Sequence, residues 1–146
     1  MYLLEKFHLV QFFLFRAETL SFSPATGIVA PNGSGKSAIL DAMQIVLYGG
    51  DQNQIDLNAQ SGGVSGTRGR SVREYCLGYY RGDEHIRENA TSYLTMVFRD
   101  TEGELPPVSV GLALGASVGG HPNHRIGNRY SDLKEMGRDV DNPAGV

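Results

Sequence analysis

The sequence predicts an α/β fold in which strands form most of the ordered structure and a helix follows a glycine-rich turn. Apolar and polar residues alternate with the period of a strand near the N-terminus and again between residues 91 and 114. Between these regions, the apolar residues after position 35 recur with the period of an α-helix. We therefore expect an α+β fold with a mixed sheet, organised as one domain over residues 1–118.

The first thirty residues are expected to be β structure. An apolar stretch covers residues 7–15, alternation follows at 19–22, and Ser23-Pro24 supplies a turn. The next run, residues 27–30, is short and apolar, which predicts a buried strand. This strand would lead directly into the glycine-rich turn at residues 31–35.

A helix is expected directly after that turn. Ile39, Met43, Val46 and Leu47 lie at i, i+4, i+7 and i+8, which places them on one helical face. Gly49-Gly50 follows, where a residue in the left-handed conformation commonly ends a helix.

The second half of the domain is expected to hold a short helix and a hairpin. Ser71 and Glu74 form a capping-box pattern, and four residues continue with helical spacing. They are Val72, Tyr75, Cys76 and Tyr79. The alternating segments 91–99 and 108–114 flank a turn-rich stretch, which predicts a β-hairpin.

Composition narrows the class of protein. The chain has 146 residues and a net charge of −3, which disfavours a domain that binds nucleic acid through bulk positive charge. Its single cysteine, Cys76, excludes an internal disulfide and is typical of a reduced, cytoplasmic protein. We expect no membrane contact. Residues 119–146 are polar and rich in Gly and Pro, and we expect a poorly ordered tail there.

The motif that carries chemistry is a phosphate-binding loop, or Walker A motif. It fits the pattern G-x-x-x-x-G-K-[ST], with Ala in place of the first Gly. The candidate nucleotide-binding residues are Ala30, Pro31, Asn32, Gly33, Ser34, Gly35, Lys36, Ser37 and Ala38.

Each residue type in the loop has a physical reason. Gly33 and Gly35 let successive main-chain N–H groups approach a polyphosphate, and the helix that follows adds the positive end of its dipole. Lys36 can reach the β- and γ-phosphates, and the Ser37 hydroxyl is the candidate ligand for Mg²⁺. Without a bound anion, Lys36 would stand unfavourably at a helix N-terminus.

Two stretches of the sequence resemble the N-terminal ATPase lobe of SMC-like proteins, the chromosome-organising and repair ATPases that include SMC, SbcC and MukB. They are residues 1–22 and 27–47, which contain Pro-Asn-Gly-Ser-Gly-Lys-Ser followed by Ile39, Leu40, Asp41 and Ala42. Residues 57–82 look most like the MukB-like subgroup, especially the large ATPase of Wadjet plasmid-defence systems. The resemblance extends to about residue 115.

This resemblance implies an ABC-type P-loop NTPase half-head, with a β-rich lobe and a strand–loop–helix phosphate site that uses ATP and Mg²⁺. In such proteins a C-terminal lobe supplies the signature motif, the Walker B carboxylates and a switch His. The implied partners are that C-terminal lobe, a second ATPase head, and DNA through the assembled complex. The apolar run 94–98 before Arg99-Asp100 imitates a Walker B strand, but we interpret it as part of the hairpin.

The resemblance also implies that the chain is part of a longer head and is inactive as an ATPase alone. A docking face for the missing lobe would leave apolar hairpin residues less buried than their alternation implies. The two candidate sets are Leu94, Met96 and Phe98, or Val108, Val110 and Leu112.

Three arginines near the second helix have two interpretations. Arg68, Arg70 and Arg73 could contact DNA phosphates or the nucleotide of a partner head, or they could be solvated and balanced by neighbouring acidic residues. Two other functions also stay open for the chain: a self-contained small P-loop NTPase or kinase, and a non-catalytic interaction module.

Overall fold

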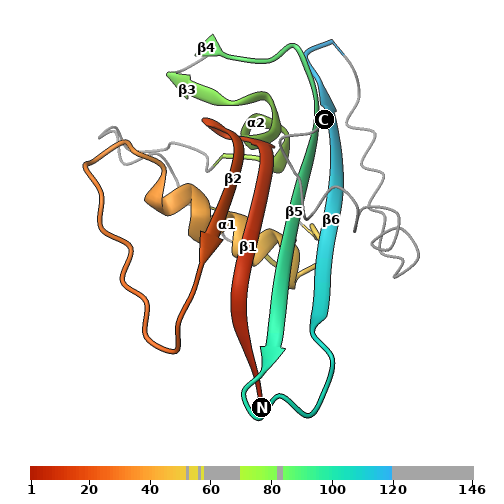
Figure 1. The fold of residues 1–146 in the computed structure, drawn as a ribbon. Helices are drawn as coiled ribbons and strands as arrows, with labels where there is room; N and C mark the ends of the chain where they lie inside the picture. The colour runs from red at the N-terminus through yellow and green to blue at the C-terminus, as the bar shows by residue number, and fades with distance from the viewer. Residues whose placement is uncertain (52, 56, 58–69, 82–83, 120–146) are drawn as a thin grey trace.

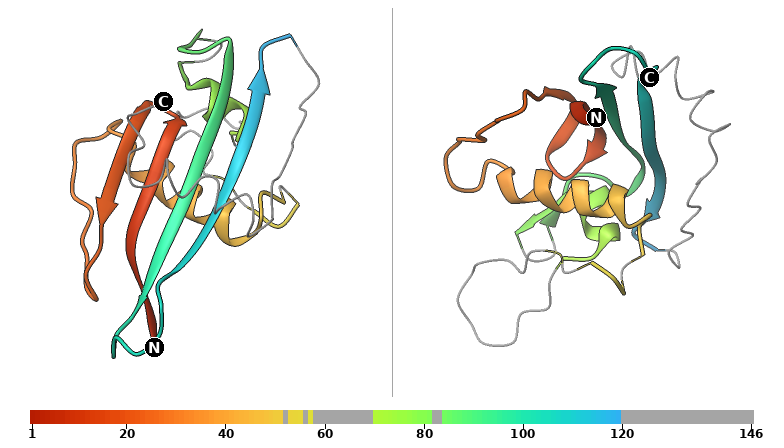
Figure 2. Two further views of the ribbon diagram at one scale, coloured as in Figure 1. Left: turned by 45° about the vertical axis from the view of Figure 1, so that its right-hand side comes forward. Right: turned by 90° about the horizontal axis from the view of Figure 1, so that it is seen from below.

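In a computed structural model, residues 1–51, 53–55, 57, 70–81 and 84–119 are described. Four long strands form a twisted sheet, and two helices lie against one face of it (Figures 1 and 2). The strands are β1 (Tyr2–Phe12), β2 (Phe15–Ser21), β5 (Asn89–Asp100) and β6 (Val108–Ser117).

The sheet has the order β2-β1-β5-β6, and each neighbouring pair is antiparallel. In its middle, Leu94 of β5 pairs with Leu9 of β1 on one side and with Leu112 of β6 on the other. The predicted hairpin is therefore confirmed as β5 and β6. The expected mixed sheet is wrong for the described strands. The direct connections from β1 to β2 and from β5 to β6 favour antiparallel pairs, and the central β1–β5 pair is antiparallel as well.

Helix α1 (Lys36–Leu47) packs against the sheet with one face, which is buried in each successive turn. Its buried apolar residues are Ala38, Ile39, Ala42, Ile45 and Val46. Leu47 was expected on this face but is 65% exposed, because the buried face is centred on Ala42 and Ile45 and Leu47 lies away from it. The predicted helix end is confirmed: Gly49 and Gly50 have φ of 63° and 77°.

Helix α2 (Val72–Leu77) begins with the predicted capping box, since Ser71 and Glu74 bind each other's main-chain N–H groups. It ends earlier than the spacing predicts. Gly78 takes up a left-handed φ of 72°, and Tyr79 starts the short strand β3 (Tyr79–Arg81) instead of continuing the helix. This strand pairs with β4 (Glu84–His85), and the Tyr79 ring stacks on His85 with centroids 4.9 Å apart.

One hydrophobic core lies between the helices and the sheet. It combines Phe7 and Leu9 from β1 with Leu94 and Met96 from β5, all at 1% exposure or less. Cys76 of α2 belongs to the same core, as its position on the apolar face of the predicted helix indicated. Burial raises the pKa of its thiol to about 11, so the cysteine is a packing residue and an unreactive one.

The strand expected at residues 27–30 is not present. Val29 is 95% exposed, Ile28 is 37% exposed, and the segment forms part of a loop that leads from β2 to α1 (Figure 1). A strand needs a neighbour for its main-chain N–H and C=O groups, and none of the described strands pairs with this run. The apolar pattern was therefore a poor guide to burial here.

The end of the hairpin next to the β5–β6 connection extends past the hydrophobic core. Val108 and Val110 of β6 are each 40% exposed, whereas Leu112 and Leu94 are buried. The expectation of reduced burial is confirmed for these two valines and is wrong for Leu94, Met96 and Leu112, while Phe98 is partly buried, so neither candidate set is less buried as a whole. Among the described residues, no helix is long and apolar enough to cross a membrane.

Replacing Gly78 by Ala should lower the free energy of unfolding by about 2–4 kcal/mol, from a left-handed φ and from overpacking. An added Cβ would lie 2.8 Å from the Phe13 carbonyl oxygen and would collide with the Ile86 side chain. Gly103→Ala is the matched control, since Gly103 has a φ of 73° and open space around it. Gly103→Ala should lower the free energy of unfolding by about 1–2 kcal/mol, and urea denaturation of both variants measures the difference. Equal losses in the two variants would contradict the close approach at Gly78.

Candidate nucleotide-binding site

The phosphate loop joins the exposed segment after β2 to the first turn of α1. Gly33 and Gly35 have φ of 81° and 99°, a region that favours glycine. The Ser34 N–H donates to the Pro31 carbonyl at 3.3 Å, and the Ile39 N–H donates to the Gly35 carbonyl at 3.1 Å. Gly35 is thus the N-cap of α1, and no side chain caps the first turn. The loop presents main-chain N–H groups at the positive end of the helix dipole.

Lys36 closes the loop from the helix side. Its ammonium donates to the Ala30 carbonyl and, at 2.8 Å, to the Pro31 carbonyl. These two bonds hold the side chain across the mouth of the loop, beside the main-chain N–H groups. An ammonium has three hydrogens, so these bonds leave one for an anion in the cradle.

Glycine is also required at position 35 because an aromatic side chain of the sheet approaches its main chain closely. A Cβ at this position would lie 2.8 Å and 3.3 Å from two ring atoms of Phe15, at the start of β2. Phe13 approaches the same point, with one ring atom at 3.7 Å. Aromatic side chains from the β1–β2 turn therefore support the last glycine of the loop.

The residues present fit a phosphate group with Mg²⁺. An added Cβ at Gly33 would meet no atom within 4 Å, so the loop has open space at this glycine for a ligand. The exposed hydroxyl of Ser37 follows Lys36 in the first turn of α1. A hydroxyl oxygen is a suitable Mg²⁺ ligand beside phosphate oxygens, and Ser37 would hold the ion.

A buried polar contact anchors α1 one turn beyond Ser37. Asp41 is 3% exposed and accepts a hydrogen bond from the Tyr75 hydroxyl of α2. The Tyr75 ring stacks on Phe12 at 5.0 Å and meets Phe13 edge-on at 5.8 Å. Burial, together with the bond to Asp41, raises the pKa of Tyr75, so the phenol stays protonated. This contact fixes α1 relative to α2 and to the β1–β2 turn.

The three candidate arginines have different environments. Arg68 lies outside the described residues. The Arg70 guanidinium lies over the Phe13 ring, 4.5 Å from its centroid, and 5.6 Å from that of Tyr75. Arg73 donates through Nε and Nη2 to the Ser117 carbonyl, at 3.0 Å and 2.8 Å. Arg70 and Arg73 therefore make contacts within the chain, and a contact with DNA or a partner head stays a prediction.

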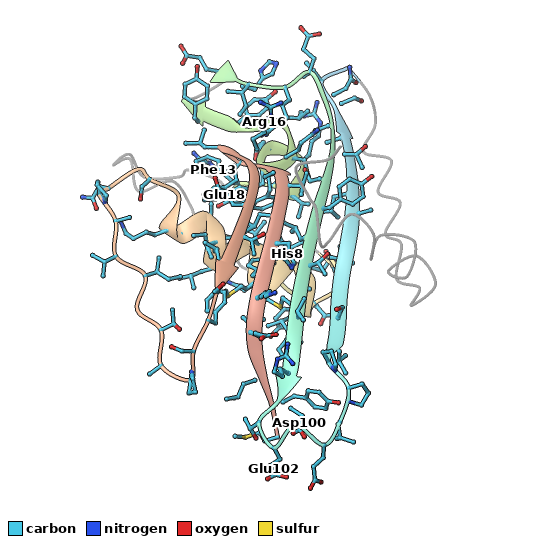
Figure 3. The ribbon with its side chains drawn as sticks, in the orientation of Figure 1. His8, Phe13, Arg16, Glu18, Asp100 and Glu102 are labelled. Carbon is cyan, nitrogen blue, oxygen red and sulfur yellow. The ribbon has the colours of Figure 1, made fainter. Side chains whose placement is uncertain are left out.

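Asp100, at the end of the Walker B-like run, lies far from the phosphate loop. It is at the opposite end of the sheet from Phe13 (Figure 3), where Asp100 pairs with Tyr2 in the β1–β5 register. Its carboxylate binds the Met1 ammonium at 2.8 Å and accepts the N–H groups of Glu104 and Leu105. These contacts lower the pKa of Asp100. The interpretation of this run as part of a hairpin is confirmed.

Sequence reasoning did not identify the supporting residues. Phe15 was assigned to an apolar stretch, and Tyr75 was assigned to a helix face, without any link to the loop. Arg87 donates to the Phe13 and Phe15 carbonyls, and no sequence pattern indicates these contacts. These residues are distant from the loop in the sequence, so a local pattern carries no signal for their contacts.

A glycine-rich turn at a helix N-terminus, followed by a lysine bound to the carbonyls of the turn, is typical of P-loop nucleotide-binding domains. A sequence model of the AAA domain family matches residues 6–136, and the chain belongs to that family. Membership makes it a P-loop ATPase domain of the AAA type and implies the use of ATP and usually Mg²⁺. No curated protein matches the chain.

Replacing Tyr75 by Phe should lower the free energy of unfolding by about 1–3 kcal/mol, because a buried carboxyl group loses one hydrogen-bond donor. Tyr2→Phe is the control, since the Tyr2 hydroxyl donates to the exposed Pro106 carbonyl at 2.8 Å. Removal of the Tyr2 hydroxyl should lower the free energy of unfolding by less than about 1 kcal/mol.

The pH dependence of the Tyr75 contribution follows from the direction of its pKa shift. A phenol whose folded-state pKa is raised contributes stability fully below the ordinary tyrosine value and loses it only in more alkaline solution. The difference in unfolding free energy between wild type and Tyr75→Phe should therefore stay constant from about pH 6 to 8. A difference that falls across this range would contradict the assignment.

Proposed function

We propose that the chain is the ATP-binding N-terminal lobe of an SMC-like ATPase that acts in DNA organisation, repair or plasmid defence. The large ATPase of a Wadjet-type system is the particular subgroup we propose. The observation that carries the proposal is the geometry of the loop, where Lys36 is bound to the Ala30 and Pro31 carbonyls at the start of α1. The resemblance of residues 1–22 and 27–47 to SMC-like proteins supports the finer assignment.

The arrangement suits binding of a nucleotide's phosphates. The loop supplies N–H donors, the helix supplies a dipole, and Lys36 supplies a full positive charge. Hydrolysis needs, in addition, a group that orients the attacking water. Among the described carboxyl groups, Asp41 of α1 is bound to Tyr75, and Asp100 after the Walker B-like run is bound to Met1. In this proposal the group that orients the attacking water comes from the C-terminal lobe, as the resemblance implies.

Exposed apolar residues before the loop and along the outward side of α1 support a docking face for the C-terminal lobe of the same ATPase. Val29 precedes the loop, and three more residues lie on the outward side of α1 or at its end. They are Leu40, Leu47 and Tyr48, which are 55%, 65% and 50% exposed. Apolar groups in one neighbourhood favour association with a partner surface. A strand of that lobe would pair with residues 27–30, which pair with none of the described strands.

Lys36→Ala should abolish binding of Mg·ATP to the chain, because the substitution removes the positive charge at the phosphate cradle. Isothermal titration calorimetry measures this directly. Lys6→Ala is a matched control that removes an exposed lysine from β1, and it should bind as the wild type does. Equal nucleotide binding by the wild type and Lys36→Ala would overturn the nucleotide-binding assignment.

The purified chain should hydrolyse ATP at background rate, and addition of a C-terminal lobe should restore turnover that depends on Lys36. A phosphate-release assay with and without the co-expressed lobe measures both effects. Steady turnover by the chain alone, lost in Lys36→Ala, would support a self-contained NTPase instead. Nucleotide binding without turnover in any combination of lobes would favour a non-catalytic module.

A further inference from the structure

Arg87, in the segment between β4 and β5, joins two separate parts of the chain. Its Nη1 donates to the Phe13 carbonyl at 2.9 Å and to the Cys76 carbonyl at 3.2 Å. Its Nη2 donates to the Phe15 carbonyl at 3.0 Å. One half-buried guanidinium thus binds the β1–β2 turn and the C-terminal end of α2 together.

The β1–β2 turn is one that needs such support. Phe13 has a φ of 49°, a left-handed conformation that residues with side chains rarely adopt. The Phe13 N–H donates to the Tyr75 carbonyl at 2.7 Å, and the Arg70 guanidinium covers its ring. Non-glycine residues persist in this region when the surrounding contacts determine their conformation.

The turn is also the part of the sheet that contacts the phosphate loop. The Phe15 ring fills the space that a side chain at Gly35 would occupy, and Gly35 is the N-cap of α1. A shift of the Phe15 main chain would move this ring against or away from the loop. The position of the loop's last glycine therefore depends on the contacts that hold Phe15.

We propose that Arg87 is a positioning residue for the phosphate loop, acting through the Phe13 and Phe15 carbonyls and the contact of the Phe15 ring with Gly35. The inference rests on the proposed nucleotide-binding function and deepens it. The Arg87 guanidinium donates to three main-chain carbonyls, so it does not serve as a phosphate ligand in this arrangement. Its role is to fix the loop before any nucleotide arrives.

The side-chain chemistry explains why arginine suits this position. A guanidinium is planar and has N–H donors on separate nitrogens, so it can bind three carbonyls whose positions differ. A lysine ammonium keeps the charge but concentrates its donors on one atom. Arg87→Lys should therefore preserve part of the clamp, and Arg87→Met should remove all of it while keeping a long apolar stem.

The test measures the loop in the absence of nucleotide and then measures nucleotide affinity. Hydrogen–deuterium exchange of residues 33–38 should be faster in Arg87→Met and in Phe15→Leu than in the wild type, with Arg87→Lys between them. Mg·ATP affinity, by calorimetry, should fall about tenfold or more in Arg87→Met, the effect of losing hydrogen bonds from a charged donor.

Asp100→Asn is the control for a general loss of stability. Asp100 is buried and holds the main chain of a turn, as Arg87 does, but at the opposite end of the sheet. This variant should lose stability in urea without faster exchange at residues 33–38 and without weaker nucleotide binding. If Asp100→Asn, at the same loss of stability as Arg87→Met, shows the same faster exchange of residues 33–38, the proposal is overturned.

If Arg87→Met folds and its residues 33–38 exchange as slowly as in the wild type, the proposal is also overturned. If Arg87→Met does not fold, Arg87→Lys and Phe15→Leu decide the same question, and wild-type loop exchange in both overturns the proposal. Failure of the proposed function gives a different result. The wild type would then bind no Mg·ATP, while exchange of residues 33–38 would still respond to Arg87.

Discussion

The packing of α1 against the antiparallel sheet is the constraint on which the site depends. Ala38 and Ala42 are 3% and 0% exposed, and these small side chains let the helix approach the sheet closely. Ile45 and Val46 continue the contact into the core that contains Leu9 and the hairpin residues. Because the phosphate loop ends at the N-cap of this helix, the sheet face determines where the loop's N–H groups and the helix dipole point.

Local features of the sequence predicted the parts of the fold that short-range interactions determine. The loop, the extent of α1 and the capping box of Ser71 and Glu74 depend on residues within a few positions of each other, and the β5–β6 hairpin pairs two strands that follow each other in the sequence. Backbone preferences and side-chain periodicity act over the same range, so the pattern carried enough information.

Predictions that needed a distant partner were less successful. Residues 27–30 have the composition of a strand, but a strand also needs a neighbour, and sequence alone does not show whether one is present. Tyr79 has helical spacing, yet Gly78 ends α2 one residue earlier, where Phe13 and Ile86 approach the glycine. The contacts of Asp41 with Tyr75 and of Arg87 with Phe15 span 34 and 72 residues. No local rule relates such pairs.

The position of α1 has a consequence for regulation of the proposed head. Its first turn carries the phosphate loop, its inner face is fixed by the sheet, and its outward side carries the exposed Leu40 and Leu47. A nucleotide and a docked lobe would therefore bind the same helix at different surfaces. When two ligands each favour one position of a shared element, each increases the affinity for the other by the same factor. Such coupling would act through α1 without any contact between lobe and nucleotide, and substitutions on its outward side would change nucleotide affinity only while the lobe is present.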